Sequence, residues 1–253
     1  MRFASLGSGS RGNATLVESG ATRILIDCGF SCAETERRLA RLSLHPQDLS
    51  GILVTHEHSD HIAGVARLSR RHRIPVWMTA GTEAMHQGGE LAAWHCFSSH
   101  RPFAIGDLEI NPFPVPHDAR EPCQFVLSDG ALRLGVLTDV GSITPHMLQS
   151  LDGLDALLLE CNHDVEMLAN GPYPPALKRR VGGAFGHLSN DQAAEILANV
   201  DISGLQQLVA AHLSDKNNHP DLVRSALAAV LGCAASEVRV ADQQMGIAWS
   251  LMS

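Results

Sequence analysis

The sequence has no long hydrophobic run. Nowhere do its apolar residues approach the roughly 20 consecutive positions that a membrane-spanning helix needs. The first residues, Met1 to Ser8, also lack the apolar core of a secretory signal peptide. Both absences argue against a membrane partner, and we therefore expect a cytoplasmic location.

Paired cysteines are lacking as well. The six cysteines are scattered along 253 residues, and no two of them are arranged as C-x-x-C. Cys28 and Cys32 are close in sequence, but no second pair completes a thiolate zinc site. Scattered cysteines in a chain of this length are typical of reduced core thiols in a cytosolic protein.

Positive charge is in short supply. The chain has 19 Lys and Arg against 27 Asp and Glu, which gives a net charge of −8. Proteins that grip duplex DNA non-specifically are usually basic, so the composition argues against tight binding of that kind. A local basic patch can coexist with an acidic whole, so a nucleic-acid substrate stays open. Nothing in the sequence indicates a particular oligomeric state.

Potential metal ligands gather in one short segment, His56–His61, which reads HEHSDH. The residues before it, 51–55, are apolar and β-branched and predict a buried strand. The residues after it repeat apolar side chains at helical spacing and predict a helix over 61–72. The cluster then lies on a strand-to-helix loop, with Asp60 placed to cap the helix. A lone loop histidine is usually only solvated, but this grouping of imidazoles and a carboxylate suits zinc, manganese or iron(II).

The spacing His-x-His-x-Asp-His in this segment resembles the signature of the metallo-β-lactamase-fold hydrolases. Three further segments look like the YycJ-type subgroup of that superfamily, which is regarded as exonuclease-like: Leu6–Asn13, Glu160–Asp164 and Gly186–Asn190. The Gly/Ser run in the first of them lacks the Lys-Ser/Thr of a P-loop and predicts a tight loop between strands. The resemblance runs along nearly the whole chain.

The order of predicted elements is consistent with this resemblance. Each half begins with strands and continues with helices, and no Pro/Ser-rich linker or charge run divides the chain. We expect one domain over residues 1–253, folded as a four-layer αββα sandwich of the α/β class with the ligands on loops along one edge. Expected helices span 33–42, 61–72, 82–87, 190–199 and 221–231, and expected strands include 2–6, 14–18, 22–26, 52–54, 75–79, 94–97, 124–128, 132–137, 156–159, 205–211, 237–241 and 246–251.

The resemblance implies a binuclear site with two divalent ions, zinc or manganese. One ion would be held by His56, His58 and His117, and the other by Asp60, His61 and His212, with Asp139 bridging them. Asp60 would serve in catalysis as well as ligation, and Asp27 would be structural. Histidine at position 58 favours hydrolysis, because the di-iron oxygen-reducing members typically have Glu there. Two cations can lower the pKa of a shared water to near 7 and so provide a hydroxide for attack.

Two residues between these motifs indicate the class of substrate. Glu160 and a His-Leu-Ser segment at His187 occur in the same order as in tRNase Z-type phosphodiesterases, where the non-ligand histidine acts on the phosphate or the leaving oxygen. His187 held by Glu160 could protonate a leaving alkoxide. The alternative is that His187 has only a structural role, either as a helix-capping residue or as a packed side chain. Asn13 and His163 are further candidates for substrate contact, although His163 could instead buttress His187. The basic run 178–180 could grip a polyphosphate backbone, but three such charges are more often a solvated helix face.

The function predicted is therefore a metal-dependent phosphodiesterase, most simply an exonuclease-like nuclease that acts on DNA, RNA or another phosphodiester. A thioester or small-ester hydrolase of the glyoxalase II type is the alternative, but a thiolate leaving group needs little acid help and such enzymes lack the pair Glu160 and His187. A metal-binding protein without catalysis is the third possibility. A missing ligand would favour it, and none of the seven is missing.

Overall fold

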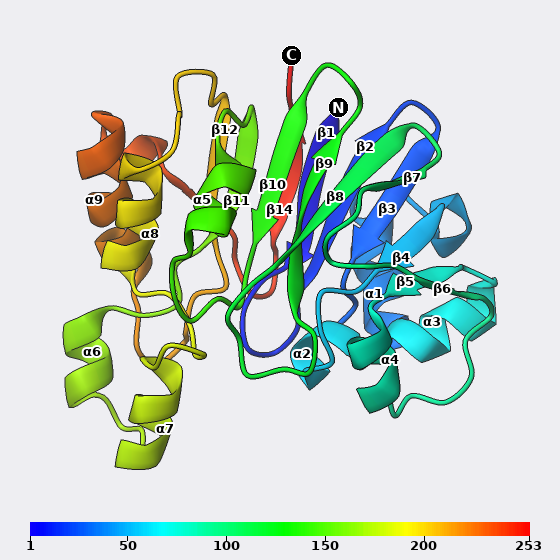
Figure 1. Ribbon diagram of the computed structural model, residues 1–253, viewed down its shortest axis with the longest axis horizontal. Helices are drawn as coiled ribbons and strands as arrows, with labels where there is room; N and C mark the ends of the chain where they lie inside the picture. Colours follow the sequence, from blue (N-terminus) through cyan, green and yellow to red (C-terminus); the bar gives the residue numbers. More distant parts are fainter.

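In a computed structural model that describes residues 1–253, two seven-stranded mixed sheets face one another (Figure 1). The first sheet has the order β14-β1-β2-β3-β4-β5-β6. Its strands are β1 Arg2–Gly7, β2 Ala14–Ser19, β3 Thr22–Ile26, β4 Gly51–Leu53, β5 Val76–Met78, β6 Trp94–Cys96 and β14 Ile247–Leu251. β1, β2 and β3 pair antiparallel, whereas β3 to β6 run parallel.

The second sheet has the order β13-β12-β11-β10-β9-β8-β7. Its strands are β7 Phe103–Ile105, β8 Leu108–Pro114, β9 Cys123–Ser128, β10 Arg133–Leu137, β11 Ala156–Glu160, β12 Gln207–Ala211 and β13 Arg239–Val240. β7 to β10 form an antiparallel meander, and β10 to β13 run parallel. Parallel strands end at one edge of their sheet, so residues that follow them are brought together.

Helices cover the outer face of each sheet, so the layers run helix, sheet, sheet, helix (Figure 1). They are α1 Cys32–Ala40, α2 Ser59–Ile62, α3 Val65–His72, α4 Ala80–Met85, α5 Pro145–Leu151, α6 Val165–Asn170, α7 Pro175–Val181, α8 Asn190–Ala198 and α9 Pro220–Leu231, with two short 3-10 turns at Pro46–Asp48 and Ala235–Glu237. α6 and α7 stand apart below the second sheet. No helix is long and apolar enough to span a bilayer.

Three hydrophobic clusters occupy the spaces between these layers. Along β3, Ile24 and Ile26 belong to the cluster between the two sheets, whereas Leu25 between them packs under α1 and α3. Side chains also alternate along β11: Leu158 lies between the two sheets, and Leu157 packs under α5, α8 and α9. Strands buried on both faces have continuous apolar sequences, which is why these runs predicted strands. The expected αββα sandwich is confirmed.

The segment 59–72 differs from the single helix expected over 61–72. It forms two helices, α2 and α3, which break at Gly64. There the backbone passes so close to another loop that a Cβ on Gly64 would clash with the carbonyl oxygen of Phe30. The expected cap was also wrong, because His58 is the N-cap residue and Asp60 is the second residue of α2.

Several elements were not expected from the sequence. α5, α6 and α7 and strand β7 lie in segments to which no element was assigned, and the expected helix 82–87 and strands 94–97 and 237–241 are shifted or shorter in the structure. α7 has no buried residue and α6 has only Leu168, so neither helix has the apolar stripe that reveals a helix in sequence.

Candidate metal centre and active site

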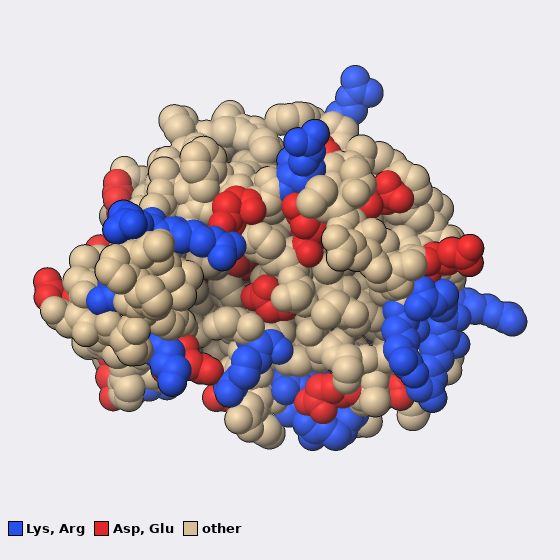
Figure 2. All heavy atoms as spheres, turned by 90° about the horizontal axis from the view of Figure 1, so that it is seen from below, with Lys and Arg blue, Asp and Glu red and all other residues tan.

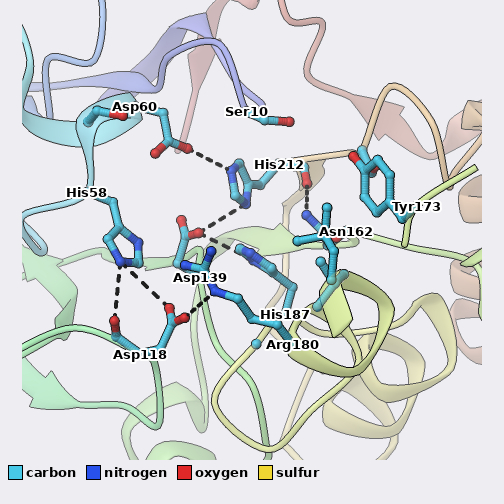
Figure 3. Close-up of a pocket in the computed structure, with 15 residues that line it drawn as sticks. Ser10, His58, Asp60, Asp118, Asp139, Asn162, Tyr173, Arg180, His187 and His212 are labelled. Atoms are coloured by element: carbon cyan, nitrogen blue, oxygen red, sulfur yellow. Dashed lines mark hydrogen bonds and ion pairs between the residues drawn. The ribbon is translucent and has the colours of Figure 1, made fainter. Parts of the chain in front are cut away.

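Side chains from six segments converge at the lower edge of the sandwich, where parallel strands end. His56, His58, Asp60 and His61 follow β4, and His117 follows β8. The remaining candidates are Asp139 after β10, Glu160 at the end of β11, His187 in the segment before α8, and His212 after β12. Figure 3 shows five of them pointing into one cavity, His58, Asp60, Asp139, His187 and His212.

The first predicted ligand set comes together in space. The ligand atoms of His56, His58 and His117 all lie within 4.8 Å of one another. His58 Nδ1 is 3.2 Å from His117 Nε2, and the three rings meet edge to face with centroids 4.6 to 4.9 Å apart. Three imidazoles in this arrangement could hold one divalent ion and leave further positions open.

The second predicted set lies beside the first. Asp60 Oδ2 is 3.6 Å from His61 Nε2 and 3.5 Å from His212 Nε2. Asp139 lies between the two sets, because its Oδ2 is 2.8 Å from His61 Nε2 and its Oδ1 is 3.8 Å from His117 Nε2. One carboxylate thus reaches toward both groups of imidazoles, which is the position that a bridging ligand needs.

Each imidazole is held by its outer nitrogen, so the other nitrogen faces the cavity. His61 Nδ1 donates to Asp27 Oδ2 at 2.7 Å, and His117 Nδ1 donates to the carbonyl oxygen of Gly186 at 2.9 Å. His58 Nε2 lies 3.2 Å from the carbonyl oxygen of Asp118. Carboxylate or carbonyl acceptors behind a histidine fix its tautomer, a common arrangement around metal ligands.

The tautomer of His56 follows from its neighbour Thr55. The Thr55 hydroxyl donates to Asp27 Oδ2 at 2.8 Å, so it accepts the Nδ1–H of His56 at 2.9 Å. This leaves the lone pair of His56 on Nε2. That nitrogen is buried and has no hydrogen-bond partner in the chain, and the same is true of His212 Nε2. Buried polar atoms are nearly always satisfied, and a divalent ion would satisfy these two.

Burial and charge divide the histidines into two kinds. Burial alone would lower the pKa of His61, but the carboxylates of Asp139 and Asp27 outweigh it and hold that pKa well above its ordinary value. Burial likewise opposes protonation of His212, yet Asp139, Asp60 and Glu160 raise its pKa to about 10. His56 differs, because burial and the charge of His61 hold its pKa well below 6.5. The carboxylates therefore create a field that attracts positive charge.

His187 and Glu160 form a pair beside these groups. His187 Nδ1 lies 2.9 Å from Glu160 Oε1 and 3.3 Å from Asp139 Oδ1. Burial works against the charged imidazole, but Glu160 outweighs it and raises the pKa of His187. Glu160 is itself fully buried, and although burial favours its neutral form, His187 and His212 lower its pKa to about 2. It also accepts the backbone N–H groups of Val140 and Leu188.

Backbone strain is concentrated at the same place. Asp27, Asp139 and His212 have φ angles of 60°, 57° and 55°, in the left-handed region that non-glycine residues seldom adopt. Each follows a strand by one or two residues, so the backbone turns sharply as it leaves the sheet. Only Ser43 and Arg73 share this feature elsewhere in the chain. Strained backbone conformations cluster at functional sites, where the position of the side chain matters more than the conformational energy of the backbone.

The cavity beside these residues has a volume of about 340 Å³. In Figure 2, which looks up at this edge, acidic side chains lie near the middle and the surface is hollowed between the α6–α7 lobe and the rest. On one side Arg180 Nε donates to Asp118 Oδ2 at 2.6 Å, and Asp118 contacts His58 (Figure 3). Arg180 belongs to the basic run 178–180, which was predicted to be a solvated helix face; its side chain is exposed as predicted, and it also lines the cavity.

Two residues expected to contact substrate, Asn13 and His163, do not line this cavity. Asn13 is only 6% exposed, and its amide nitrogen lies 3.1 Å from His61 Nε2 while its Oδ1 accepts the N–H of Gly9, so it braces the ligand loop. His163 is buried and does not line the cavity. It pairs with Ser189 in a parallel bridge and its carbonyl oxygen accepts the N–H of Asn190, so it buttresses the segment that carries His187.

Other residues of the cavity were not expected from the sequence. Asp118, Asn162, Tyr173, Arg180 and Ser214 all line it. Asn162 donates to the carbonyl oxygen of His212 at 3.1 Å, which supports the turn after β12. Asp118 and Asn162 stand next to motif residues His117 and Cys161 and could have been considered on that ground. For Tyr173 the sequence offers no indication of a place in the cavity beyond its being the single tyrosine of the chain.

Comparisons with known proteins agree with this site. The profile of the beta-lactamase superfamily domain matches residues 22–213. The chain is 38% identical over 235 residues to the exodeoxyribonuclease YycJ of Bacillus anthracis, covering 91% of this chain and 89% of the relative. Identity to the exodeoxyribonuclease WalJ of Streptococcus pneumoniae is 35% over 229 residues, covering 87% and 84%. The metallo-beta-lactamase fold protein YhfI of Bacillus subtilis has the same fold, with a TM-score of 0.75 at 18% identity over 98% of both chains.

Proposed function

This chain belongs to the beta-lactamase superfamily, and from that membership and the geometry of its site we propose that it is a binuclear metal-dependent nuclease. The metals are two divalent ions, zinc or manganese. Because the two relatives above are named exodeoxyribonucleases, we propose DNA as the substrate and a strand end as the place of cleavage. The predicted single-domain organisation over residues 1–253 is part of the same proposal.

One observation carries the proposal: two groups of ligands meet at Asp139, and a carboxylate-held histidine stands beside them. His56, His58 and His117 would hold one ion, Asp60, His61 and His212 would hold the other, and Asp139 would bridge. When bound, two such ions supply an activated water and neutralise phosphate oxygens.

The chain itself would supply the proton that the reaction needs. Breaking a phosphodiester expels an alkoxide, which is a poor leaving group until it is protonated. Glu160 raises the pKa of His187 and so favours its protonated form. His187 lines the cavity, and because its Nδ1 contacts Glu160, its Nε2 is left to face the substrate. Glu160 keeps its own charge, since its pKa is about 2, and so orients the ring. Arg180, fixed by Asp118, would bind a phosphate oxygen at the rim.

The same pair argues against the thioester alternative. A thiolate leaves readily near neutral pH, so a thioesterase gains little from a held proton donor. We therefore expect phosphodiesters to be hydrolysed much faster than thioesters, rather than broad hydrolytic activity on both.

The test uses the full chain loaded with Mn²⁺ or Zn²⁺ and four substrates: end-labelled single-stranded DNA, duplex DNA, RNA and S-lactoylglutathione. We expect shortening of labelled DNA from an end, loss of activity with a chelator, and little action on the thioester. His187→Ala should lose about 10²- to 10⁴-fold in kcat. His146→Ala, an exposed histidine on α5, is the matched control and should match the wild type. Efficient thioester hydrolysis with no cleavage of any phosphodiester would overturn the proposal.

A further inference from the structure

One wall of the catalytic cavity is apolar, in contrast to the remaining lining. Of 15 lining residues only three are hydrophobic, and Tyr173, Leu177 and Val181 are neighbours on and just before α7. We call these three residues the α7 wall. Figure 3 shows Tyr173 on the side of the cavity away from His58 and Asp60. The metal ligands and the proton donor do not account for an apolar surface here.

The α7 wall is fixed relative to the reacting groups. The backbone N–H of His187 donates to the carbonyl oxygen of Val181 at 2.8 Å, so the end of α7 is tied directly to the residue proposed as the proton donor. Arg180, next to Val181, is tied to Asp118. In the middle of α7, Lys178 Nζ donates to the carbonyl oxygen of Ala169 at 2.6 Å, which ties α7 to α6. Two prolines after Tyr173 further stiffen the approach to the helix.

The chemistry of the wall matches one part of a nucleotide. With the scissile phosphate between the two ligand sets, the attached nucleoside must lie against some face of the cavity. Sugars and phosphates prefer polar partners, whereas a nucleobase has a flat apolar face that stacks on aromatic side chains. A tyrosine flanked by two aliphatic side chains offers such a surface. At about 340 Å³ the cavity is also near the lower limit of small-ligand sites, so one nucleotide fits and a stacked duplex does not.

We propose that the α7 wall binds the unstacked base of the nucleotide next to the scissile phosphate, with Tyr173 as the stacking residue. The inference rests on the proposed nuclease function and narrows its substrate to a single-stranded or frayed end, because a base paired inside a duplex cannot lie on the wall. The base is held by stacking and not by hydrogen bonds to its edge, so the preference among the four bases is weak.

The test compares two single-stranded DNA substrates that differ at one position. One carries a normal base on the terminal nucleotide that is released, and the other is abasic there. Stacking is worth about 1–3 kcal/mol per base, so Tyr173→Ala should raise KM for the normal strand roughly 5- to 150-fold. It should leave kcat and the abasic substrate nearly unchanged. Tyr173→Phe should restore the wild-type KM, because the ring is kept.

The control is Met245→Ala, a residue that is 67% exposed and lies outside this cavity. It should leave KM unchanged for both substrates, and thermal unfolding should show that the variants are folded. An equal loss on normal and abasic strands, or an unchanged KM in Tyr173→Ala, overturns the base-binding role while the nuclease function stands. If the wild type cleaves no phosphodiester, both the function and this inference fail.

Discussion

Replacing Asp27 tests whether a residue that contacts no metal controls the metal site. Asp27 is 3% exposed and accepts three hydrogen bonds: from Thr55 N at 2.9 Å, Thr55 Oγ1 at 2.8 Å and His61 Nδ1 at 2.7 Å. Asn is the least disruptive substitution, because it keeps one acceptor and tolerates the φ of 60°. The amide NH₂ of Asn would take the place of Oδ2, which now accepts hydrogen bonds from Thr55 Oγ1 and His61 Nδ1, and an NH₂ group cannot accept them.

The expected magnitude follows from those contacts. Two buried donors lose their acceptor, and each such loss costs about 1–3 kcal/mol, so Asp27→Asn should lower the free energy of unfolding by about 2–6 kcal/mol. With His61 no longer held, affinity for the second ion should fall about 10- to 100-fold, as is usual when the partner of a ligating histidine is removed. The first set, which Asp27 reaches only through Thr55, should be affected less.

The assay is a competition titration with a chelator of known affinity, run with denaturant unfolding of the metal-free protein. Asp107→Asn is a matched control, because Asp107 accepts hydrogen bonds from Ala21 and Thr22 far from the site. Unchanged affinity for both ions in a folded Asp27→Asn variant would refute the idea that Asp27 positions His61.

Three further outcomes are expected. Asp139→Ala should bind both ions poorly, since one carboxylate serves both sets; metal analysis that finds two tightly bound ions per chain would contradict the bridging role. The defect of His187→Ala should shrink on aryl phosphodiesters, whose leaving groups need no proton, whereas an equal defect on good and poor leaving groups would assign His187 to phosphate binding. Glu34→Gln should lower the free energy of unfolding by about 1 kcal/mol at neutral pH, because Arg37 and Arg38 hold the pKa of Glu34 at about 2 against an ordinary 4.5. Because the pKa of Glu34 is lower in the folded state than in the unfolded state, its contribution to the free energy of unfolding is present above pH 4.5 and disappears as pH falls toward 2. The free energies of unfolding of the wild type and Glu34→Gln should therefore become equal near pH 2.

The fold was accessible from the sequence because its sheets are buried on both faces. Continuous apolar runs such as that of β11 predict strands, and a polar residue directly after each run predicts the edge where ligands gather. Glu160 and His212 follow this rule. The resemblance then connected segments far apart in the chain, which periodicity alone cannot do.

The rest depended on contacts between distant segments. Asn13 is a polar loop residue, and its sequence position does not distinguish binding of substrate from the bracing of the ligand loop that the structure has. The helical pattern is interrupted at Gly64, where the loop at Phe30 passes against the backbone. α7 has no buried residue, so neither its helix nor the cavity wall it forms leaves a periodic signal. These features arise from packing that local sequence does not encode.

We propose that two divalent ions held in one site make this chain a nuclease. The most direct test is to strip the protein with a chelator, add Mn²⁺ or Zn²⁺ back in measured equivalents, and follow cleavage of end-labelled DNA at each step. We expect activity to rise until two equivalents are bound per chain and then to level off. Full activity at one equivalent, or no cleavage at any metal content, would contradict it.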